Sequence, residues 1–564
     1  MKNSNKITKG VLRAPHRSLL YALGLEIEDL DKPFIGIANS YNETIPGHRH
    51  LRGVVEAIKE GIYKSGGIPF EFNTIGICDG IAMNHEGMSY SLASRQLICD
   101  SVVVQAKGFP FDGIVFVPNC DKVVPGMLMA AAKLNLPSIF ISGGPMLAGK
   151  VNNEKTSLTT VFEAVGKYER NEITDEQLSD YEQNACPTCG SCSGMYTANT
   201  MNCLCEALGI ALPGNGSIPA VYSKRTRLYK KAGQTIMNLV NDNLRFLDIV
   251  TKESFMNAIA CDMAMTGSTN TILHLLAVAN YADIDLNLND FESIAKKVPQ
   301  LCKLSPASDL SIEDFDNAGG MMALMNELAK NDNTIFDAKT VINPSLCKQI
   351  KPYNIMDTSI ITSLDSPISK VSGLTILKGN IAMEGAVLKT GAIEKDQEYF
   401  KGKAIVFENE QNCVDFLIKD KIAEDEKYVL VIRNMGIKGG YGMPEMLTPT
   451  SLIKGLNLGK TVALITDGRF SGGSNGLVIG HVCPEASENG TIGIINNDDI
   501  IEIDLTKNEI NLLIDELEIK DRLTKKQKEI KKSHNYLDVY TSLASNASYG
   551  GGVKEWRILL EKLI

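Results

Sequence analysis

Apolar runs alternate with amphipathic stretches over the first part of the chain. Short runs rich in β-branched residues occupy positions 34–39, 70–77, 113–118 and 137–142, and they predict buried strands. Between them, positions 50–64, 91–106 and 127–134 carry apolar side chains at helical spacing. Strands that alternate with helices of this length indicate βαβ units. The fold class that we expect is therefore α/β, with an N-terminal doubly wound parallel sheet.

The rest of the chain has a different pattern. Positions 195–328, in the middle, are predicted to be mainly helical. In the last third, after the Pro- and Ser-containing stretch 358–372, short β-rich runs separated by glycines dominate. These runs lie at 403–407, 428–432, 461–465, 491–495 and 500–505. Such spacing predicts a smaller C-terminal β-rich domain with a sandwich or barrel core. We place the boundary near residue 370, which gives domains 1–370 and 371–564.

Composition narrows the class of protein. A chain of 564 residues with 44% hydrophobic and 22% charged residues is typical of a globular protein of at least two domains. The net charge of −10 argues against nucleic acid as a partner, and no apolar stretch approaches the length of a membrane span. Thirteen unevenly spaced cysteines favour reduced thiols and metal ligands over disulfides. We therefore expect a cytoplasmic protein.

Reactive side chains follow the predicted strand 113–118. Cys120, Asp121 and Lys122 are consecutive and stand at the carboxyl end of a buried strand, where parallel sheets bind ligands. A second loop carries three further cysteines, Cys186, Cys189 and Cys192. Soft sulfur ligands beside hard oxygen ligands suggest an iron–sulfur cluster and a divalent cation such as Mg²⁺.

Several residues allow two interpretations. The second cysteine loop starts like a ferredoxin motif, but Tyr196 occupies the fourth position. Glu445 and Ser471 lie in glycine-rich segments, so each is either a ligand-binding group or part of an ordinary turn. His48 and His50 resemble a metal-binding pair, although histidines that pack a loop are at least as frequent. For four cysteines we favour buried thiols without a ligand: Cys99, Cys203, Cys205 and Cys261.

Taken together, these segments resemble the family that dihydroxy-acid dehydratase shares with 6-phosphogluconate dehydratase and sugar-acid dehydratases. The similar stretches lie at 46–51, 72–83, 119–122, 125–127, 142–146, 186–202, 213–217, 442–446 and 466–473, in family order. The pair Asn-Cys-Asp-Lys at 119–122 and Asp-Gly-Arg-Phe-Ser-Gly-Gly at 467–473 is the most specific part of the match.

The resemblance implies roles for individual residues. The iron–sulfur cluster would be bound by Cys120 and Cys192. Ser471 would be the base. The Mg²⁺ ligands would be Asp79, Asp121, Lys122 and Glu445. An ammonium cannot donate a lone pair to a cation, so Lys122 fits this role only as the carbamylated lysine that the family uses.

One position departs from the family pattern. Many members carry a third cluster cysteine where this chain has Gly47. Cys78 and Cys189 are then the candidates for the third ligand, and the sequence does not choose between them. A 2Fe–2S cluster is favoured and a 4Fe–4S cluster is the alternative.

The reaction implied by the resemblance is the dehydration of a 2,3-dihydroxy acid to a 2-oxo acid. The expected substrates are 2,3-dihydroxyisovalerate and 2,3-dihydroxy-3-methylvalerate, in valine and isoleucine biosynthesis, and the expected assembly is a homodimer. A sugar-acid or 6-phosphogluconate dehydratase is the alternative within the family. An iron–sulfur electron carrier is a rival from another class, but it would leave Asp79, Asp121 and Glu445 without a role.

Overall fold

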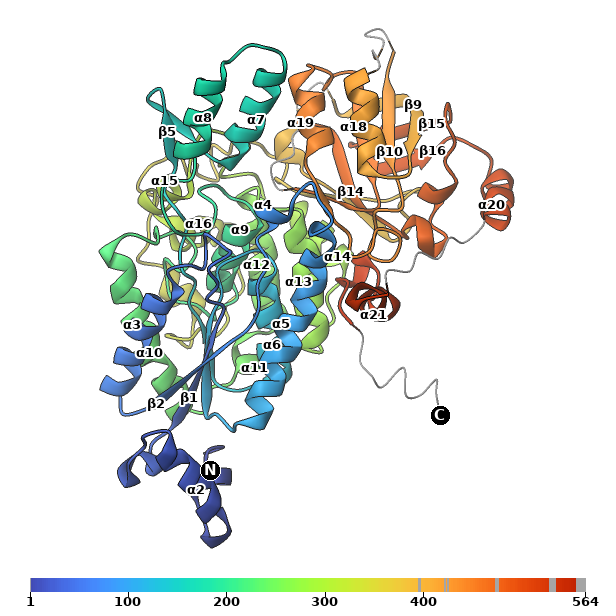
Figure 1. The fold of residues 1–564 in the computed structure, drawn as a ribbon. Helices are drawn as coiled ribbons and strands as arrows, with labels where there is room; N and C mark the ends of the chain where they lie inside the picture. Colours follow the sequence, from blue (N-terminus) through green and yellow to red (C-terminus); the bar gives the residue numbers. More distant parts are fainter. Residues whose placement is uncertain are drawn as a thin grey trace.

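The computed structural model describes residues 2–393, 397–419, 422, 426–471, 476–526 and 534–553. Figure 1 shows two bodies side by side: a larger one built from the first two thirds of the chain and a smaller one built from the last third. This arrangement confirms the predicted α/β class with a second, β-rich unit. The division at residue 370 stays a prediction, and the first strand of the smaller body begins at Thr375.

Four parallel strands form the main sheet of the larger body. They are β1 (Phe34–Asn39), β2 (Ile68–Asn73), β3 (Gly113–Val117) and β4 (Ser138–Phe140), in the order β2-β1-β3-β4. Every position of β1 and β3 is buried, because helices cover both faces of the sheet. All four predicted strands are present, but β4 is shorter than expected and β2 ends at Asn73, so residues 74–77 of the predicted strand lie in the loop that follows.

Helices on the two sides of this sheet make it doubly wound (Figure 1). On one side α3 (Leu51–Lys64) packs against α10 (Ser223–Asn241). Glycines permit this close crossing, since a Cβ on Gly61 would lie 2.2 Å from the carbonyl oxygen of Lys230. On the other side lie α5 (Met88–Gly108) and α6 (Val123–Leu134), which pack together.

The strand order fixes where the loops separate. The chain moves from β1 outward to β2 and then crosses back to β3, so the loops after β1 and β3 leave the sheet in opposite directions. Parallel sheets bind ligands in the crevice at such a point. The loop after β3 carries residues 118–122, and the loop after β2 leads into the short helix α4 (Asp79–Ala82).

The middle of the chain is helical, as predicted. Its most buried helices are α9 (Thr197–Ala207), α12 (Lys252–Ala264), α13 (Asn270–Tyr281) and α16 (Gly320–Leu328). All of α9 is buried, so this helix crosses the core. Peripheral helices include α2 (Ala14–Ala22), α7 (Leu158–Glu169), α8 (Asp175–Asn184) and α14 (Leu288–Ala295). No helix in the described ranges combines the length and apolarity of a membrane span.

The smaller body is built on a nearly closed, barrel-like sheet. Among the described residues its strands are β7 (Thr375–Leu377), β8 (Gly385–Leu388), β9 (Tyr399–Phe407), β10 (Tyr428–Ile432), β12 (Val462–Thr466), β14 (Val478–Cys483), β15 (Ile500–Asp504) and β16 (Glu509–Leu512). Their order is β16-β15-β9-β10-β12-β14-β8-β7. The two outermost strands meet at a bridge between Lys378 and Glu509, where Ile510 N–H donates to the Lys378 carbonyl at 2.7 Å. These bonds satisfy strand edges that would otherwise stay open.

One predicted strand of this body is wrong. Residues 491–495 form the 3₁₀ turn η5 (Thr491–Ile494), in which Gly493 N–H donates to the Gly490 carbonyl at 2.9 Å. A Cβ on Gly490 would lie 1.8 Å from the Pro484 carbonyl oxygen, so the segment folds tightly against its neighbours. The run is apolar because it is buried in the barrel core, and burial alone does not distinguish a turn from a strand.

Candidate active site

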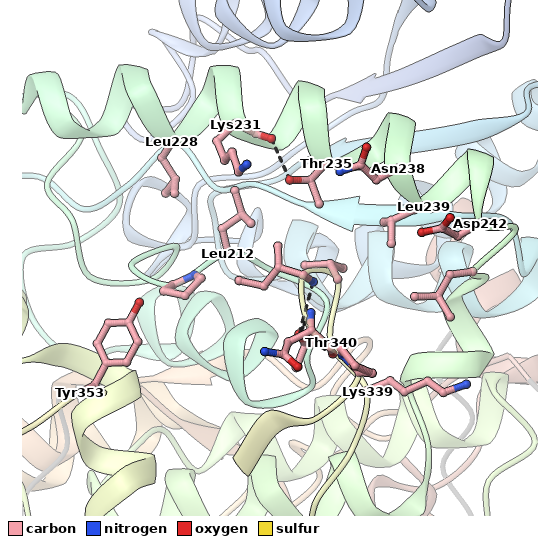
Figure 2. Close-up of a pocket in the computed structure, with 16 residues that line it drawn as sticks. Leu212, Leu228, Lys231, Thr235, Asn238, Leu239, Asp242, Lys339, Thr340 and Tyr353 are labelled. Atoms are coloured by element: carbon pink, nitrogen blue, oxygen red, sulfur yellow. Dashed lines mark hydrogen bonds between the residues drawn. The ribbon is translucent and has the colours of Figure 1, made fainter. Parts of the chain in front are cut away.

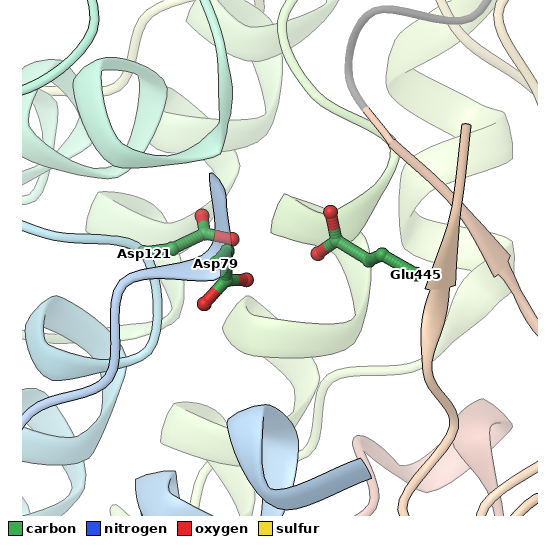
Figure 3. Close-up of side chains that lie close together, drawn as sticks. All are labelled: Asp79, Asp121 and Glu445. Atoms are coloured by element: carbon green, nitrogen blue, oxygen red, sulfur yellow. The ribbon is translucent and has the colours of Figure 1, made fainter. Parts of the chain in front are cut away.

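Three carboxylates from both bodies meet at the crevice (Figure 3). Asp79 begins α4 and Asp121 follows β3, whereas Glu445 lies on the short strand β11 (Glu445–Met446) and faces them. One oxygen of each lies within 4.8 Å of the others. Within the described part of the chain, the buried Oδ1 of Asp121 has no hydrogen-bond partner. A hard cation with oxygen ligands fits these residues.

Lys122 lies among the three carboxylates. Its Nζ donates to Asp79 Oδ2 and Asp121 Oδ2 at 2.5 Å each, and to Glu445 Oε1 at 2.9 Å. Burial disfavours its ammonium, but the surrounding carboxylates raise the pKa of Lys122 above its ordinary value. The unmodified Lys122 ammonium therefore neutralises part of the negative charge of the three carboxylates, which a metal ion would otherwise neutralise.

The two aspartates differ in their pKa. Burial raises the pKa of Asp121 well above its ordinary value, and the charges of Asp79 and Glu445 act in the same direction. Burial also opposes ionisation of Asp79, but the charge of Lys122 and the hydrogen bonds that Asp79 accepts from Asp121 and Lys122 outweigh it, so the pKa of Asp79 is lowered. The two carboxyl groups are so close that ionisation of one disfavours ionisation of the other.

Three residues that the sequence did not single out complete this cluster. Arg469, which is fully buried, donates from Nη1 to Glu445 Oε1 at 2.7 Å, and Asn270 Nδ2 donates to the same oxygen at 2.8 Å. Ser91 Oγ donates to Asp79 Oδ1 at 2.8 Å. These hydrogen bonds hold the carboxylates of Glu445 and Asp79 in position. Arg469 lies inside the specific segment 467–473, which was the only available signal.

Ser471 is connected to Glu445 through a short parallel strand pair. Strand β13 (Arg469–Phe470) pairs with β11 so that Arg469 stands opposite Glu445. Ser471 continues this pairing, because its N–H donates to the Met446 carbonyl at 2.9 Å. Ser471 thus lies directly after β13, two residues beyond Arg469. The adjoining Gly472 and Gly473 lie outside the described residues.

A small cavity of about 20 Å³ contains Ser471 and Lys389 among its lining residues. This volume holds about one water molecule. Burial lowers the pKa of Lys389 to about 8, against the opposing charge of Asp262. A cation near a serine favours its ionised form, so Lys389 is a further residue of interest that the sequence did not indicate.

The cysteines predicted as cluster ligands lie near the carboxylates, since Asp79 and Asp121 are charged neighbours of both Cys120 and Cys192. Cys120, Cys192 and Cys78 are each partly accessible, whereas Cys99, Cys203, Cys205 and Cys261 are buried as predicted. Burial raises the pKa of Cys120 and of Cys192, and the charge of Cys78 acts first among the neighbouring thiols on both. A set of soft thiolates fits an iron–sulfur cluster, although the ligand roles stay a prediction.

His48 packs the loop after β1 and is not a metal ligand in this arrangement. Its Nδ1 bonds to the Ser40 carbonyl at 2.6 Å, and its Nε2 accepts the N–H of Cys120 at 2.9 Å. A neutral His48 with its proton on Nδ1 makes both hydrogen bonds, so neither ring nitrogen has a free lone pair for a metal ion. Burial lowers the pKa of His48 to about 4. His50 bonds through Nε2 to the Gly143 carbonyl at 2.9 Å.

A larger cavity lies away from these groups. It has a volume of about 750 Å³ and is bounded by α10 and the segment 339–344 (Figure 2). Its lining includes Leu212, Thr235, Asn238 and Tyr353. It shares no lining residue with the carboxylate or cysteine clusters.

Comparison with known proteins decides the family. The model described as "Dihydroxy-acid/6-phosphogluconate dehydratase N-terminal" matches residues 32–349, and its C-terminal counterpart matches residues 359–551. The chain belongs to this dehydratase family. The predicted resemblance is therefore confirmed.

Individual relatives support the same conclusion. A protein named dihydroxy-acid dehydratase from Caldanaerobacter subterraneus subsp. tengcongensis is 52% identical over 553 residues, which is 98% of this chain and 99% of the relative. Proteins of the same name from Halothermothrix orenii and Aquifex aeolicus are 51% and 50% identical, each over 97% of this chain and over 99% and 98% of the relatives. The similarity to this dehydratase family therefore extends over both bodies of the chain.

Proposed function

We propose that the chain is a dihydroxy-acid dehydratase, a hydro-lyase that converts 2,3-dihydroxyisovalerate and 2,3-dihydroxy-3-methylvalerate to 2-oxo acids. One observation carries the proposal. Cys120, which belongs to the group of cysteines, and Asp121, which belongs to the group of carboxylates, are consecutive residues of one loop. An electron carrier has no use for the group of carboxylates. A dehydratase uses both, because it must activate a proton and a leaving hydroxyl on neighbouring carbons.

Each cluster would hold one cofactor. Asp79, Asp121, Glu445 and a carbamylated Lys122 would hold Mg²⁺, and Cys120 and Cys192 would bind a 2Fe–2S cluster, with 4Fe–4S as the alternative. When bound, the two would act as Lewis acids, toward the substrate carboxylate and 2-hydroxyl on one side and the 3-hydroxyl on the other.

The protein's own residues would orient the substrate and accept its proton. Ser471 would take the C2 proton, which requires that nearby positive charge lower its pKa. Lys389 lines the same cavity and Arg469 precedes Ser471 by two residues, and both are cations. Arg469 and Asn270 would hold Glu445 in place during the reaction.

Product analysis tests the proposal. Reconstituted enzyme should form 2-oxo acids from both branched dihydroxy acids and should turn over gluconate and 6-phosphogluconate far more slowly. Faster turnover of either sugar acid would replace the proposal with the alternative within the family.

Cysteine replacements test the cluster ligands. Cys120→Ser and Cys192→Ser should each abolish the visible iron–sulfur absorbance, because thiolates hold such clusters. Cys203→Ser is the matched control, since Cys203 is fully buried and should leave the absorbance unchanged. Full cluster occupancy in Cys192→Ser would contradict the assignment.

We further propose a cytoplasmic homodimer. All thirteen cysteines are free, which supports a reducing compartment. The N-terminal segment around α2 extends from the body (Figure 1) and exposes apolar side chains, with Leu12 at 86%, Leu19 at 71% and Ile27 at 72%. Exposed apolar surface of this kind is typical of an interface. A monomeric mass in light scattering would refute this assembly.

A further inference from the structure

A fully buried asparagine directly precedes Cys120. Asn119 follows β3, and its Nδ2 donates to the carbonyl oxygens of Gly47 at 2.7 Å and of Gly144 at 3.1 Å. Its Oδ1 accepts the N–H of Gly144 at 3.1 Å. Gly47 lies in the loop after β1, and Gly144 lies in the loop after β4. One side chain therefore joins the loops that follow three strands of the parallel sheet.

A second fully buried asparagine holds the segment of Cys192. Asn199 lies in the first turn of α9, and its Nδ2 donates to the carbonyl oxygens of Cys192 and Gly194, the latter at 2.7 Å. Its Oδ1 accepts the hydroxyl of Ser191 at 2.7 Å. The backbone of Cys192 and the side chain of the residue before it are thus both bonded to Asn199.

The carbonyl of Gly144 connects the two asparagines. Besides Asn119 Nδ2, it accepts the N–H of Ser191 at 3.0 Å, and Ser191 Oγ lies 3.2 Å from the same oxygen. A continuous hydrogen-bonded path therefore runs from Asn119, next to Cys120, through Gly144 and Ser191 to Asn199. We call these four residues the asparagine network.

The loops of the asparagine network meet at the sulfur of Cys120. A Cβ placed on Gly47 would lie 2.9 Å from Cys120 Sγ and 3.2 Å from the carbonyl oxygen of Gly190. Gly47 is bonded to Asn119, and Gly190 directly precedes Ser191. The sulfur therefore lies beside both loops that the network holds together.

Buried hydrogen bonds of this kind do more than fill space. Apolar side chains can pack a core without the desolvation cost of an amide, whereas a buried polar network specifies one arrangement because its bonds are directional. A metal cofactor requires ligands that are held in this way, since losing the groups that orient them weakens binding. This requirement explains why the amides are placed next to the two cysteines.

We propose that Asn119 and Asn199 are positioning residues for the iron–sulfur cluster, which set the spacing of Cys120 and Cys192 through the backbone before the cluster binds. The inference rests on the proposed function, because it assumes that these two cysteines bind a cluster. Each asparagine acts on a cysteine loop and is not itself a ligand.

Leucine replacements test the proposal, because leucine has the branching of asparagine but no polar group. Full-length Asn119→Leu, Asn199→Leu and parent proteins are loaded with cluster anaerobically and then exposed to an iron chelator. Each variant should release its cluster about tenfold faster or more, as expected when a group that orients metal ligands is lost. The remaining cluster should give a shifted electron paramagnetic resonance spectrum, because its thiolates are held at a different spacing.

Asn257→Leu is the matched control. Asn257 is a fully buried asparagine of α12 whose Nδ2 donates to the Phe336 carbonyl at 2.8 Å and whose Oδ1 accepts the Phe336 N–H at 2.7 Å. These bonds are of the same kind, but they hold a segment other than the cysteine loops. The control should lower the urea midpoint as the other two variants do, with parental cluster release and spectrum. A purely structural role of Asn119 and Asn199 would make all three variants alike.

Ser191→Ala is the variant to use if the leucine variants do not fold. It removes the hydroxyl that donates to Asn199 and keeps the bond from the Ser191 N–H to Gly144. Cluster release should become about 2- to 10-fold faster, the effect of losing one hydrogen bond.

Two results would overturn the proposal. One is parental cluster release and spectrum in either Asn119→Leu or Asn199→Leu, or in Ser191→Ala where the leucine variants do not fold. The other is an equal change of release and spectrum in Asn257→Leu. Failure of the proposed function gives a different result, because the parent itself would then take up no cluster.

Discussion

Replacing Glu445 with glutamine would remove one negative charge from the carboxylate cluster without changing its shape. Glu445 Oε1 accepts hydrogen bonds from Lys122 at 2.9 Å, Asn270 at 2.8 Å and Arg469 at 2.7 Å. Two of these donors are buried cations that would lose a counter-charge. A glutamine amide can keep its oxygen toward them, but its NH₂ group would then face the other carboxylates.

The expected losses follow from these contacts. Removing one partner of a buried ion pair costs about 3–5 kcal/mol, and the retained amide oxygen should bring the loss of stability in the metal-free protein to about 3 kcal/mol. A unit charge about 4 Å away contributes about 4 kcal/mol at an effective dielectric constant of about 20. If half of that is lost for Mg²⁺, about 2 kcal/mol, the affinity falls by about 30-fold.

Isothermal titration with MgCl₂ and urea unfolding with a chelator present measure the two effects separately. Glu206→Gln is the matched control: Glu206 is a buried carboxylate of α9 that accepts the N–H groups of Gly214 and Gly216 at 2.9 Å each, and it lies outside the cluster. This control should lose stability but bind Mg²⁺ normally. An Mg²⁺ affinity of Glu445→Gln within about twofold of the parent would refute the assignment of the cluster as the metal site.

Three further predictions address the base, the acid stability and the second cation. Ser471→Ala should lower turnover by at least ~10²-fold while Mg²⁺ affinity and iron content persist, and near-normal turnover would mean that another group takes the proton. His48 has a pKa of about 4 in the folded protein against an ordinary 6.5, so the unfolded chain binds a proton that the folded one excludes. The free energy of unfolding should therefore fall as the pH drops from about 6.5 to 4, by at most about 1.4 kcal/mol per pH unit from this group. The urea midpoint of His48→Gln should depend less steeply on pH than that of the parent, and equal slopes would exclude His48 as the cause. Lys389→Met should reduce turnover by about tenfold or more, since one pKa unit at Ser471 changes its ionised fraction tenfold, whereas Lys378→Met at the partly exposed Lys378 should not. Equal turnover in the two lysine variants would exclude a role for Lys389.

The sequence predicted the buried strands of the larger body well, because strands covered on both faces appear as continuous apolar runs. The same rule failed at residues 491–495, where a buried turn is equally apolar. The sequence could not distinguish a barrel from a sandwich, because closure of the sheet depends on the bridge between Lys378 and Glu509, which lie far apart in the sequence.

Prediction of the site was limited in a similar way. The Cys120–Lys122 loop could be recognised from its position after a strand, whereas the roles of Asp79, Glu445 and Ser471 came from the family resemblance. Arg469 and Asn270 were missed because their importance depends on where Glu445 is placed by the β11–β13 pair. Long-range pairing of short strands leaves little trace in local patterns.

The carboxylate cluster is divided between the two bodies, with Asp79 and Asp121 on one and Glu445 on the other. Two polypeptides that carried these bodies separately would each hold only part of this cluster. If the cluster binds Mg²⁺, as we propose, the ion would bind neither fragment well but would bind their complex, so by mass action it would promote the association of the fragments. Fragment complementation would thus become dependent on the metal, and a chelator would release one half from the other.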